Sequence, residues 1–199
     1  MDEETDDVRR KGTRKRREYR PREPRPIDAA QLQELAIGYA ARYATTASKL
    51  RRYLDRKLRE RVWTPSDPAD IDGLITRIVG LGFVDDRAFA VSKSRDLTAR
   101  GFGMGRVRGA LAAAGVSKDD AGAALTPEDD EPSDPHVAAI AFARRRRFGP
   151  FARDGAAADP SRQRRELAAM ARAGHDFSVA RRVLLAPDEA AALALAATE

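Results

Sequence analysis

The sequence predicts an all-α fold in which tandem three-helix repeats form a short curved solenoid behind a disordered N-terminal tail. Three observations carry this prediction. Apolar residues recur at the helical spacing of about 3.6 through most of the 199 residues. No window shows the alternation of β-branched and polar residues that is typical of strands. One pattern of a long helix, a basic turn, and two further helices separated by glycine also recurs along the chain.

Composition restricts both the fold and the function. Hydrophobic residues make up 42% and aromatic residues only 6%, whereas 34% are charged, so each helix has a thin apolar stripe. The absence of cysteine excludes disulfides, thiolate zinc sites and cysteine nucleophiles. No apolar run approaches the ~20 residues of a membrane span, and the N-terminus is too charged for a signal peptide. We therefore expect a cytoplasmic protein with no membrane partner.

The predicted tail, residues 1–26, has an acidic and a basic part. Residues 1–7 hold five acids and no base, and residues 8–26 hold ten bases and two acids. Almost no apolar side chains and three closing prolines predict disorder. We favour a solvated tail, and a basic arm that touches phosphates is the alternative.

The first predicted repeat covers residues 27–81. Asp28 is placed to cap its first helix, and a second helix starts near Ser48 with bases along one side. Asp67 and Pro68 combine a capping carboxylate with proline at the first helical position, so they predict the start of the third helix.

The second predicted repeat, residues 82–126, is the unit around which the chain is organised. Asp85 is a short carboxylate that can accept from the first free amides of a helix. Gly103 opens the next helix and Gly115 stops it. Ser117 then caps a third helix. None of these helices has enough apolar surface to fold alone, so the unit must stack on its neighbours.

The C-terminal part begins with an acidic linker, residues 127–133. A third repeat follows at residues 134–186, where Asp134-Pro135 and Asp159-Pro160 repeat the same start signal. Residues 187–199 are expected to form a last, alanine-rich helix.

The repeats align through their largest apolar residues. Placing Leu111 and Gly115 over Met170 and Gly174 aligns the residues that follow without a gap. Chance matching of alanine-rich helices is the alternative, but the shared order of helices, glycine and cap argues for a true repeat. The first repeat joins this alignment, with a longer second loop, through Leu50 and Leu54 over Val107 and Leu111.

Catalytic chemistry is not expected. His136 and His175 are far apart and have no cysteine partners, so neither a metal site nor a cofactor is predicted. His175 aligns with an apolar residue of the second repeat and should occupy a partly buried packing position. Asp85 and Asp86 are interpreted as helix caps rather than as a carboxylate pair for metal or acid–base work.

The glycines of residues 101–105 superficially resemble a phosphate loop. They lack the preceding strand and the Gly-Lys-Ser/Thr ending of such loops, so they predict a turn between helices. No Ser/His/Asp arrangement is apparent either, and we expect a protein that is not an enzyme.

Basic residues recur at corresponding points of successive repeats in a chain whose net charge is +6. Solvated helix faces are the simplest explanation. If the solenoid curves, however, these points form one basic stripe that binds phosphate backbones or acidic protein grooves without reading sequence. The candidate interface residues are Arg51, Arg52, Arg56, Lys57, Arg95, Arg100, Arg106, Arg108, Arg144, Arg145, Arg146 and Arg147.

The central unit resembles the RecX family of bacterial regulators of the RecA recombinase. The similarity extends over about residues 28–185. The residues that carry it are Gly82-Phe-Val-Asp-Asp86, Phe89-Ala90, Arg95, Arg100-Gly101-Phe-Gly103 and Arg106-Val-Arg108-x-x-Leu111-x-x-x-Gly115-Val116.

The resemblance implies a non-enzymatic inhibitor of RecA in recombination, DNA repair and the SOS response. Such a protein, acting as a monomer, would bind RecA–DNA filaments and limit ATPase and strand exchange. Its basic residues would contact RecA acids and the phosphates of single- or double-stranded DNA.

Two other hypotheses stay open on sequence alone. The chain could be a helical DNA-binding protein, either nonspecific or a repressor; a repressor would prefer its site over other DNA by ~10³ or more. It could also be a helical scaffold for an acidic protein, with no effect on RecA.

Overall fold

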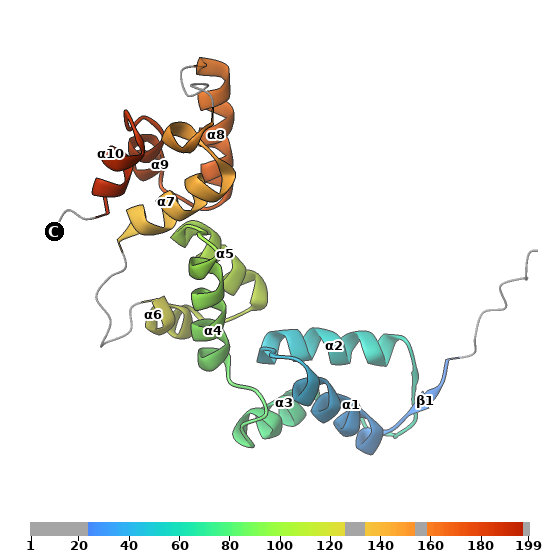
Figure 1. Cartoon of the computed structure of the whole chain (residues 1–199). Helices are drawn as coiled ribbons and strands as arrows, with labels where there is room; N and C mark the ends of the chain where they lie inside the picture. The colour runs from blue at the N-terminus through green and yellow to red at the C-terminus, as the bar shows by residue number, and fades with distance from the viewer. Residues whose placement is uncertain (1–23, 126–133, 154–158, 197–199) are drawn as a thin grey trace, which may run out of the picture.

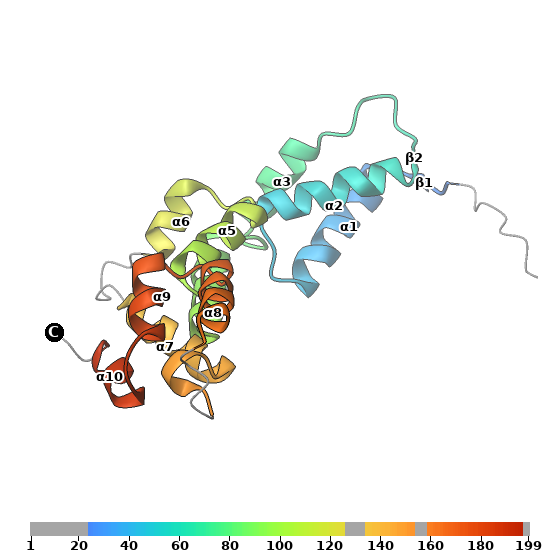
Figure 2. The ribbon, with the colours of Figure 1, turned by 90° about the horizontal axis from the view of Figure 1, so that it is seen from above.

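The structure, a computed structural model, describes residues 24–125, 134–153 and 159–196. Helices dominate these ranges, and they form three successive groups along an elongated molecule (Figure 1 and Figure 2). The first group lies at one end, the second in the middle and the third at the other end in both views. This arrangement confirms the all-helical, three-helix-repeat prediction. Residues 1–23 of the predicted tail and the predicted acidic linker, residues 127–133, lie outside the described residues.

The first group contains three helices and a small sheet. Asp28 caps the first helix as predicted, because its side chain accepts from Gln31 N at 2.8 Å. The Gln31 side chain in turn accepts from the Asp28 amide. Thr46 caps the second helix by accepting from Lys49 N at 3.1 Å. The elements are β1 (Pro26–Ile27), α1 (Ala29–Arg42), α2 (Ala47–Arg59), β2 (Val62–Trp63) and α3 (Ile71–Gly80).

The sheet was not predicted. Strands β1 and β2 run parallel, with Pro26 opposite Val62 and Ile27 opposite Trp63. Each strand is two residues long, which is too short to show any alternation of apolar and polar residues. The pair nevertheless places Ile27, which is fully buried, in the core of the first group.

The predicted helix start at Asp67-Pro68 is wrong. Helix α3 begins at Ile71, and Asp70 caps it by accepting from Gly73 N at 2.8 Å. The carbonyl of Asp67 instead accepts from the indole of Trp63 at 2.7 Å. This bond holds the chain in a loop at the position where the sequence alone favours a helix.

The second group follows the prediction closely. Asp85 caps its first helix by accepting from Ala88 N at 2.8 Å, and the Ser117 hydroxyl accepts from Asp120 N at 3.0 Å. Gly115 ends the middle helix in the left-handed conformation, with φ of 77°. The helices are α4 (Asp86–Ala99), α5 (Met104–Ala114) and α6 (Lys118–Leu125).

The third group begins at the two remaining Asp-Pro signals, and both predictions are confirmed. Asp134 accepts from His136 N at 2.8 Å, and Asp159 accepts from Ser161 N at 2.9 Å. The C-terminal helix is shorter than predicted. The elements are α7 (Pro135–Arg146), the 3-10 helix η1 (Gly149–Phe151), α8 (Pro160–Arg172), α9 (Phe177–Leu184) and α10 (Glu189–Ala194).

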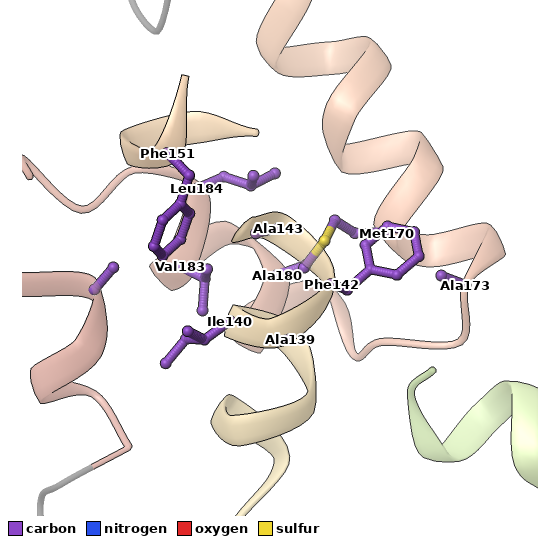
Figure 3. Packing of buried hydrophobic residues seen from close by; sticks show 11 residues of the cluster. Ala139, Ile140, Phe142, Ala143, Phe151, Met170, Ala173, Ala180, Val183 and Leu184 are labelled. Carbon is purple, nitrogen blue, oxygen red and sulfur yellow. The ribbon is translucent and has the colours of Figure 1, made fainter. Parts of the chain in front are cut away.

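Each group has its own cluster of buried apolar side chains. In the third cluster, Met170 lies beside the ring of Phe142, as Figure 3 shows. Phe102 packs against both the second and the third clusters and so links those two groups. The positions that align the repeats are all fully buried: Leu50, Leu54, Val107, Leu111 and Met170.

One aligned core position carries a charge. Glu166 lies four residues before Met170 and therefore corresponds to Val107 in the second group, yet it is only 5% exposed. Its carboxylate accepts from Arg162 Nε at 2.7 Å and from the amide of Gly149 at 2.9 Å. These bonds satisfy the buried charge and tie α8 to the turn that follows α7.

Across residues 24–125, 134–153 and 159–196, every helix is too short or too polar to cross a membrane.

Candidate functional site

The equivalent middle helices of the three groups, α2, α5 and α8, meet end to end. We call the contact between the C-terminus of α5 and the N-terminus of α2 the first junction. There the fully buried hydroxyl of Thr46 donates to the carbonyl of Ala114 at 2.6 Å. The side chain of Asp86, from α4, accepts from the amide of Ala47 at 2.8 Å. Side chains therefore bridge the helix ends of the first and second groups.

The contact between the C-terminus of α8 and the N-terminus of α5 is the second junction. The amide of Gly103 donates to the carbonyl of Ala173, and the amide of Gly105 donates to that of Gly174, both at 3.0 Å. A Cβ added at Gly103 would overlap the Gly174 carbonyl. Gly174 itself has a φ of 89°, and a Cβ there would overlap the backbone of Arg106. The ends of α8 and α5 thus meet through main-chain groups.

The two junctions are the same contact in the repeat alignment. Thr46 aligns with Gly103, and Ala114 aligns with Ala173. At each junction, the residue that precedes one middle helix donates a hydrogen bond to the carbonyl of the aligned alanine at the end of the other middle helix. This correspondence supports the repeat independently of the apolar residues that first indicated it.

Asp85 and Asp86 both serve as caps, as predicted, but on different helices. Asp85 caps α4, whereas Asp86 caps the N-terminus of α2 across the first junction. Burial raises the pKa of Asp86, and the bond from Ala47 opposes that effect. Among the described residues no group of acids and histidines is arranged to hold a metal ion.

Three cations gather at the first junction. Arg52, which was predicted, donates to the carbonyl of Ala113 at 3.2 Å. Lys49 was missed; its Nζ lies 4.2 Å from the centroid of the Phe89 ring. Burial lowers the pKa of Lys49, and the positive charges of Lys93 and Arg52 lower it further. None of the three forms an ion pair within the part of the chain that the structure describes.

A signal for Lys49 was present in the sequence. In the repeat alignment Lys49 coincides with Arg106 and with Arg165, so one position is basic in all three repeats. Lys93 has no such counterpart, and only the packing of α4 against α2 brings it to this site.

The other predicted bases of α2 have acidic partners. Arg51 pairs with Asp72 of α3. Farther along the helix, Arg56 and Lys57 both reach Glu60, at 3.6 Å and 2.7 Å. These exposed pairs contribute little to stability, and they leave the end of α2 only partly neutralised.

A second group of cations lies at the second junction. Arg145 Nη1 donates to the carbonyl of Arg100 at 2.5 Å. The guanidinium carbons of Arg145 and Arg146 lie 5.6 Å and 5.8 Å from the centroid of the Phe142 ring, and that of Arg100 lies 5.5 Å from the Phe102 ring. The structure therefore brings Arg100 together with Arg145 and Arg146, two predicted residues that lie 45 or more positions away in sequence.

Arg106 and Arg108 lie on α5, between the two junctions, and both are exposed. Arg108 lines a hollow of about 390 Å³ at the second junction, which also contains Asp134 and Asp176. Arg106 forms no ion pair with any described residue.

The remaining predicted residues have other neighbours. Arg95 lines a shallow hollow on α4 beside Asp85 and Asp96. Arg144 pairs with Glu189 at 3.3 Å. Arg147 ends α7 with a φ of 56°, and its carbonyl accepts from Arg162 at 3.1 Å. The twelve candidates thus differ in their partners, since some pair with acids or donate to carbonyls and others form no ion pair among the described residues.

His175 confirms the packing role that the alignment predicted. It is 7% exposed, and its ring centroid lies 5.3 Å from that of Phe142. Burial lowers the pKa of His175, so the buried ring is neutral near pH 7.

Comparisons with known proteins define the family. No protein-family model matches the chain. The chain is 31% identical over 183 residues to regulatory protein RecX of Myxococcus xanthus, which covers 89% of this chain and 97% of that protein. It is 32% identical over 150 residues to regulatory protein RecX of Agrobacterium fabrum, which covers 73% of this chain and 77% of that protein.

A solved structure agrees in fold. A crystal structure of regulatory protein RecX matches with a TM-score of 0.54, over 77% of this chain and 71% of that chain, at 21% identity. The chain thus shares nearly a third of its aligned residues with two regulatory proteins. The chain belongs to the RecX family of non-enzymatic regulatory proteins.

Proposed function

We propose that this protein inhibits the RecA recombinase by binding RecA–DNA filaments and limiting their ATPase and strand exchange. The observation that carries this proposal is the 31% identity to a regulatory protein RecX along 97% of that protein's length. The family resemblance in residues 82–116 implies the same partner.

The arrangement of charge supports binding to a filament. Cations gather at both junctions, and the junctions follow one another along an elongated chain (Figure 1). A filament repeats its protomers and its phosphates along one axis. Two weak contacts made together by one rigid molecule bind far more tightly than either contact alone.

Not every basic residue is an equally good probe of this surface. Arg52 and Arg145 donate to carbonyls at the junctions, so replacing them disturbs the fold as well as the surface charge. Arg106 and Arg108 are exposed, and their side chains donate to no carbonyl of the described main chain. Reversing these two charges therefore tests the interface with the least structural change.

The first test is the ATPase rate of RecA on single-stranded DNA, titrated with this protein at physiological salt. A fall at substoichiometric ratios supports end-capping or disassembly of filaments, and a fall only near saturation supports binding along the groove. An unchanged rate, with RecA shown still to bind the DNA, would overturn the proposal.

The second test compares two charge reversals of equal size. We expect Arg106→Glu/Arg108→Glu to raise the concentration needed for half inhibition by about 10-fold or more. The control, Arg181→Glu/Arg182→Glu, changes two exposed arginines on α9 that lie outside the candidate interface, and it should stay near wild type. Equal losses in both variants would show that net charge, rather than this surface, governs inhibition.

A further inference from the structure

A groove of about 750 Å³ runs between α1 and α2 of the first group, and its lining includes none of the residues that form the two junctions. Its walls combine tyrosines with cations. The residues that matter are Tyr39, Tyr43, Tyr53, Arg42, Arg56 and Lys57, and we call this site the tyrosine groove.

The three tyrosines form a row that is open at one end. The rings of Tyr39 and Tyr53 stack at 4.2 Å with an interplanar angle of 15°. Tyr43 follows at 5.3 Å from Tyr39. Tyr43 is 58% exposed, so the last ring of the row faces solvent instead of the core. The protein has four tyrosines in all, and this groove contains three of them.

Packing explains only part of this row. Tyr39 and Tyr53 are half-buried and contact the core of the first group, as an aromatic residue between two helices should. Tyr43 lies at the end of α1 and is not part of that cluster. The ring of Tyr43 is tilted by 48° from that of Tyr39, and its exposed face is a platform on which another flat ring can stack.

The cations in the groove favour an anionic occupant. Arg56 and Lys57 lie 5.6 Å and 5.7 Å from the centroid of the Tyr53 ring. Arg42 and Arg61 line the same groove, which makes four cations. Glu34 is the acid in the lining, and Glu60 pairs with Arg56 and Lys57, so the cations outnumber the nearby acids by two.

We propose that the tyrosine groove binds single-stranded nucleic acid, with a base stacked on Tyr43 and the neighbouring phosphates on Arg42, Arg56 and Lys57. Exposed rings beside basic side chains are what unpaired nucleotides need, because every base has a face to stack and every phosphate carries a charge. A duplex hides its base faces, so the groove should prefer single strands. This binding requires no RecA and goes beyond the proposed function.

The test measures binding of the full chain to labelled oligonucleotides by fluorescence anisotropy. The probes are oligothymidine, oligouridine, an abasic oligonucleotide of equal length, and a duplex. Tyr43→Ala should weaken binding of the single-stranded probes by about 10-fold, and it should leave binding of the abasic probe unchanged, because that probe has phosphates but no bases.

Two further variants make the result specific. Tyr43→Phe keeps the ring and should bind like wild type. Phe177→Ala removes an aromatic ring that is 60% exposed near Arg181 and Arg182 of α9, and it should also bind like wild type. Since Tyr43 is largely exposed, its replacement leaves the core of the first group intact.

Several outcomes would overturn the proposal. The first two are that Tyr43→Ala binds single strands as tightly as wild type, or that it loses as much affinity for the abasic probe as for the other single strands. The other two are that wild type binds the duplex more tightly than single strands, or that it binds neither oligothymidine nor oligouridine. Binding of either single-stranded probe through Tyr43 supports it. RecA inhibition is measured separately, so its absence would overturn the proposed function and leave the oligonucleotide result standing.

Discussion

The first and second junctions make the same contact with different chemistry. At the first, the hydroxyl of Thr46 and the carboxylate of Asp86 bridge the helix ends. At the second, the amides of Gly103 and Gly105 reach the terminal carbonyls directly. The middle helices therefore meet more closely where glycine replaces threonine.

Successive repeats can thus keep one hydrogen bond while the donor changes from a side-chain hydroxyl to a main-chain amide. A side-chain bridge tolerates a gap between helix ends, because the side chain spans it. A main-chain contact requires that no side chain intervene. We therefore expect that adding a side-chain atom at the second junction lowers the free energy of unfolding, and that removing a bridging side-chain group does so at the first.

The largest expected effect comes from adding one methyl group at the second junction. Gly174→Ala places a Cβ against the backbone of Arg106 at a φ of 89°, so it should lower the free energy of unfolding by ~3 kcal/mol. Urea denaturation measures the change. Gly109→Ala is the matched control in α5, where a Cβ meets nothing within 4 Å, and it should stabilise the helix by ~1 kcal/mol. Equal behaviour of the two variants would contradict the close contact.

Removing one hydroxyl at the first junction should have the next largest effect. Thr46→Val keeps the shape but removes the donor to Ala114 and the cap of α2, which should cost ~2 kcal/mol. Thr46→Ser retains the hydroxyl and should lose less than half as much. A valine variant as stable as wild type would show that the bond is dispensable.

The carboxylate of Asp86 should contribute less. Asp86→Ala leaves the amide of Ala47 without its partner and should cost ~1 kcal/mol. Asp86→Asn keeps an acceptor oxygen without the charge. Burial raises the pKa of Asp86 above 3.8, so its ionised form is disfavoured in the folded protein. The asparagine variant should therefore be at least as stable as wild type near pH 7, and the difference should shrink as the pH falls towards 3.8. Thermal melts across this range check both variants.

The smallest effect concerns acid sensitivity, which should distinguish the two junctions. His175 lies beside the second junction, whereas Val116 occupies the equivalent position near the first. Because burial lowers the pKa of His175 below 6.5, the unfolded chain takes up that proton first, and the free energy of unfolding falls as the pH drops below 6.5. His175→Val should flatten this slope in denaturation curves between pH 5 and 7. An unchanged slope would assign the acid sensitivity to another group.

Much of the fold could be predicted because its signals are local. The caps at Asp28, Asp85, Asp134 and Asp159 each depend on a carboxylate a few residues from the amides it accepts from, and all four appear in the structure. The failure at Asp67 comes from a side-chain contact made only four residues away. Its carbonyl is taken by Trp63, which no propensity reports.

The candidate site could be predicted only as a set of charges. Which of them are free depends on partners brought from other helices, such as Asp72 for Arg51 and the Arg100 carbonyl for Arg145. The neighbours of Lys93 and the exposure of Tyr43 could not be predicted for a similar reason. Their surroundings are set by how α2 lies against α4 and α1, and the repeat alignment contains no counterpart for either residue.

The end-to-end meeting of α8, α5 and α2 also has an electrostatic consequence. Each helix carries a partial negative charge at its C-terminus and a partial positive charge at its N-terminus, so both junctions place opposite poles together. The poles left over are the N-terminus of α8, where Asp159 lies, and the C-terminus of α2, where Arg56, Lys57 and Arg59 lie. Opposite poles therefore meet at both junctions, and the two outer poles of this series are each matched by side chains of opposite charge.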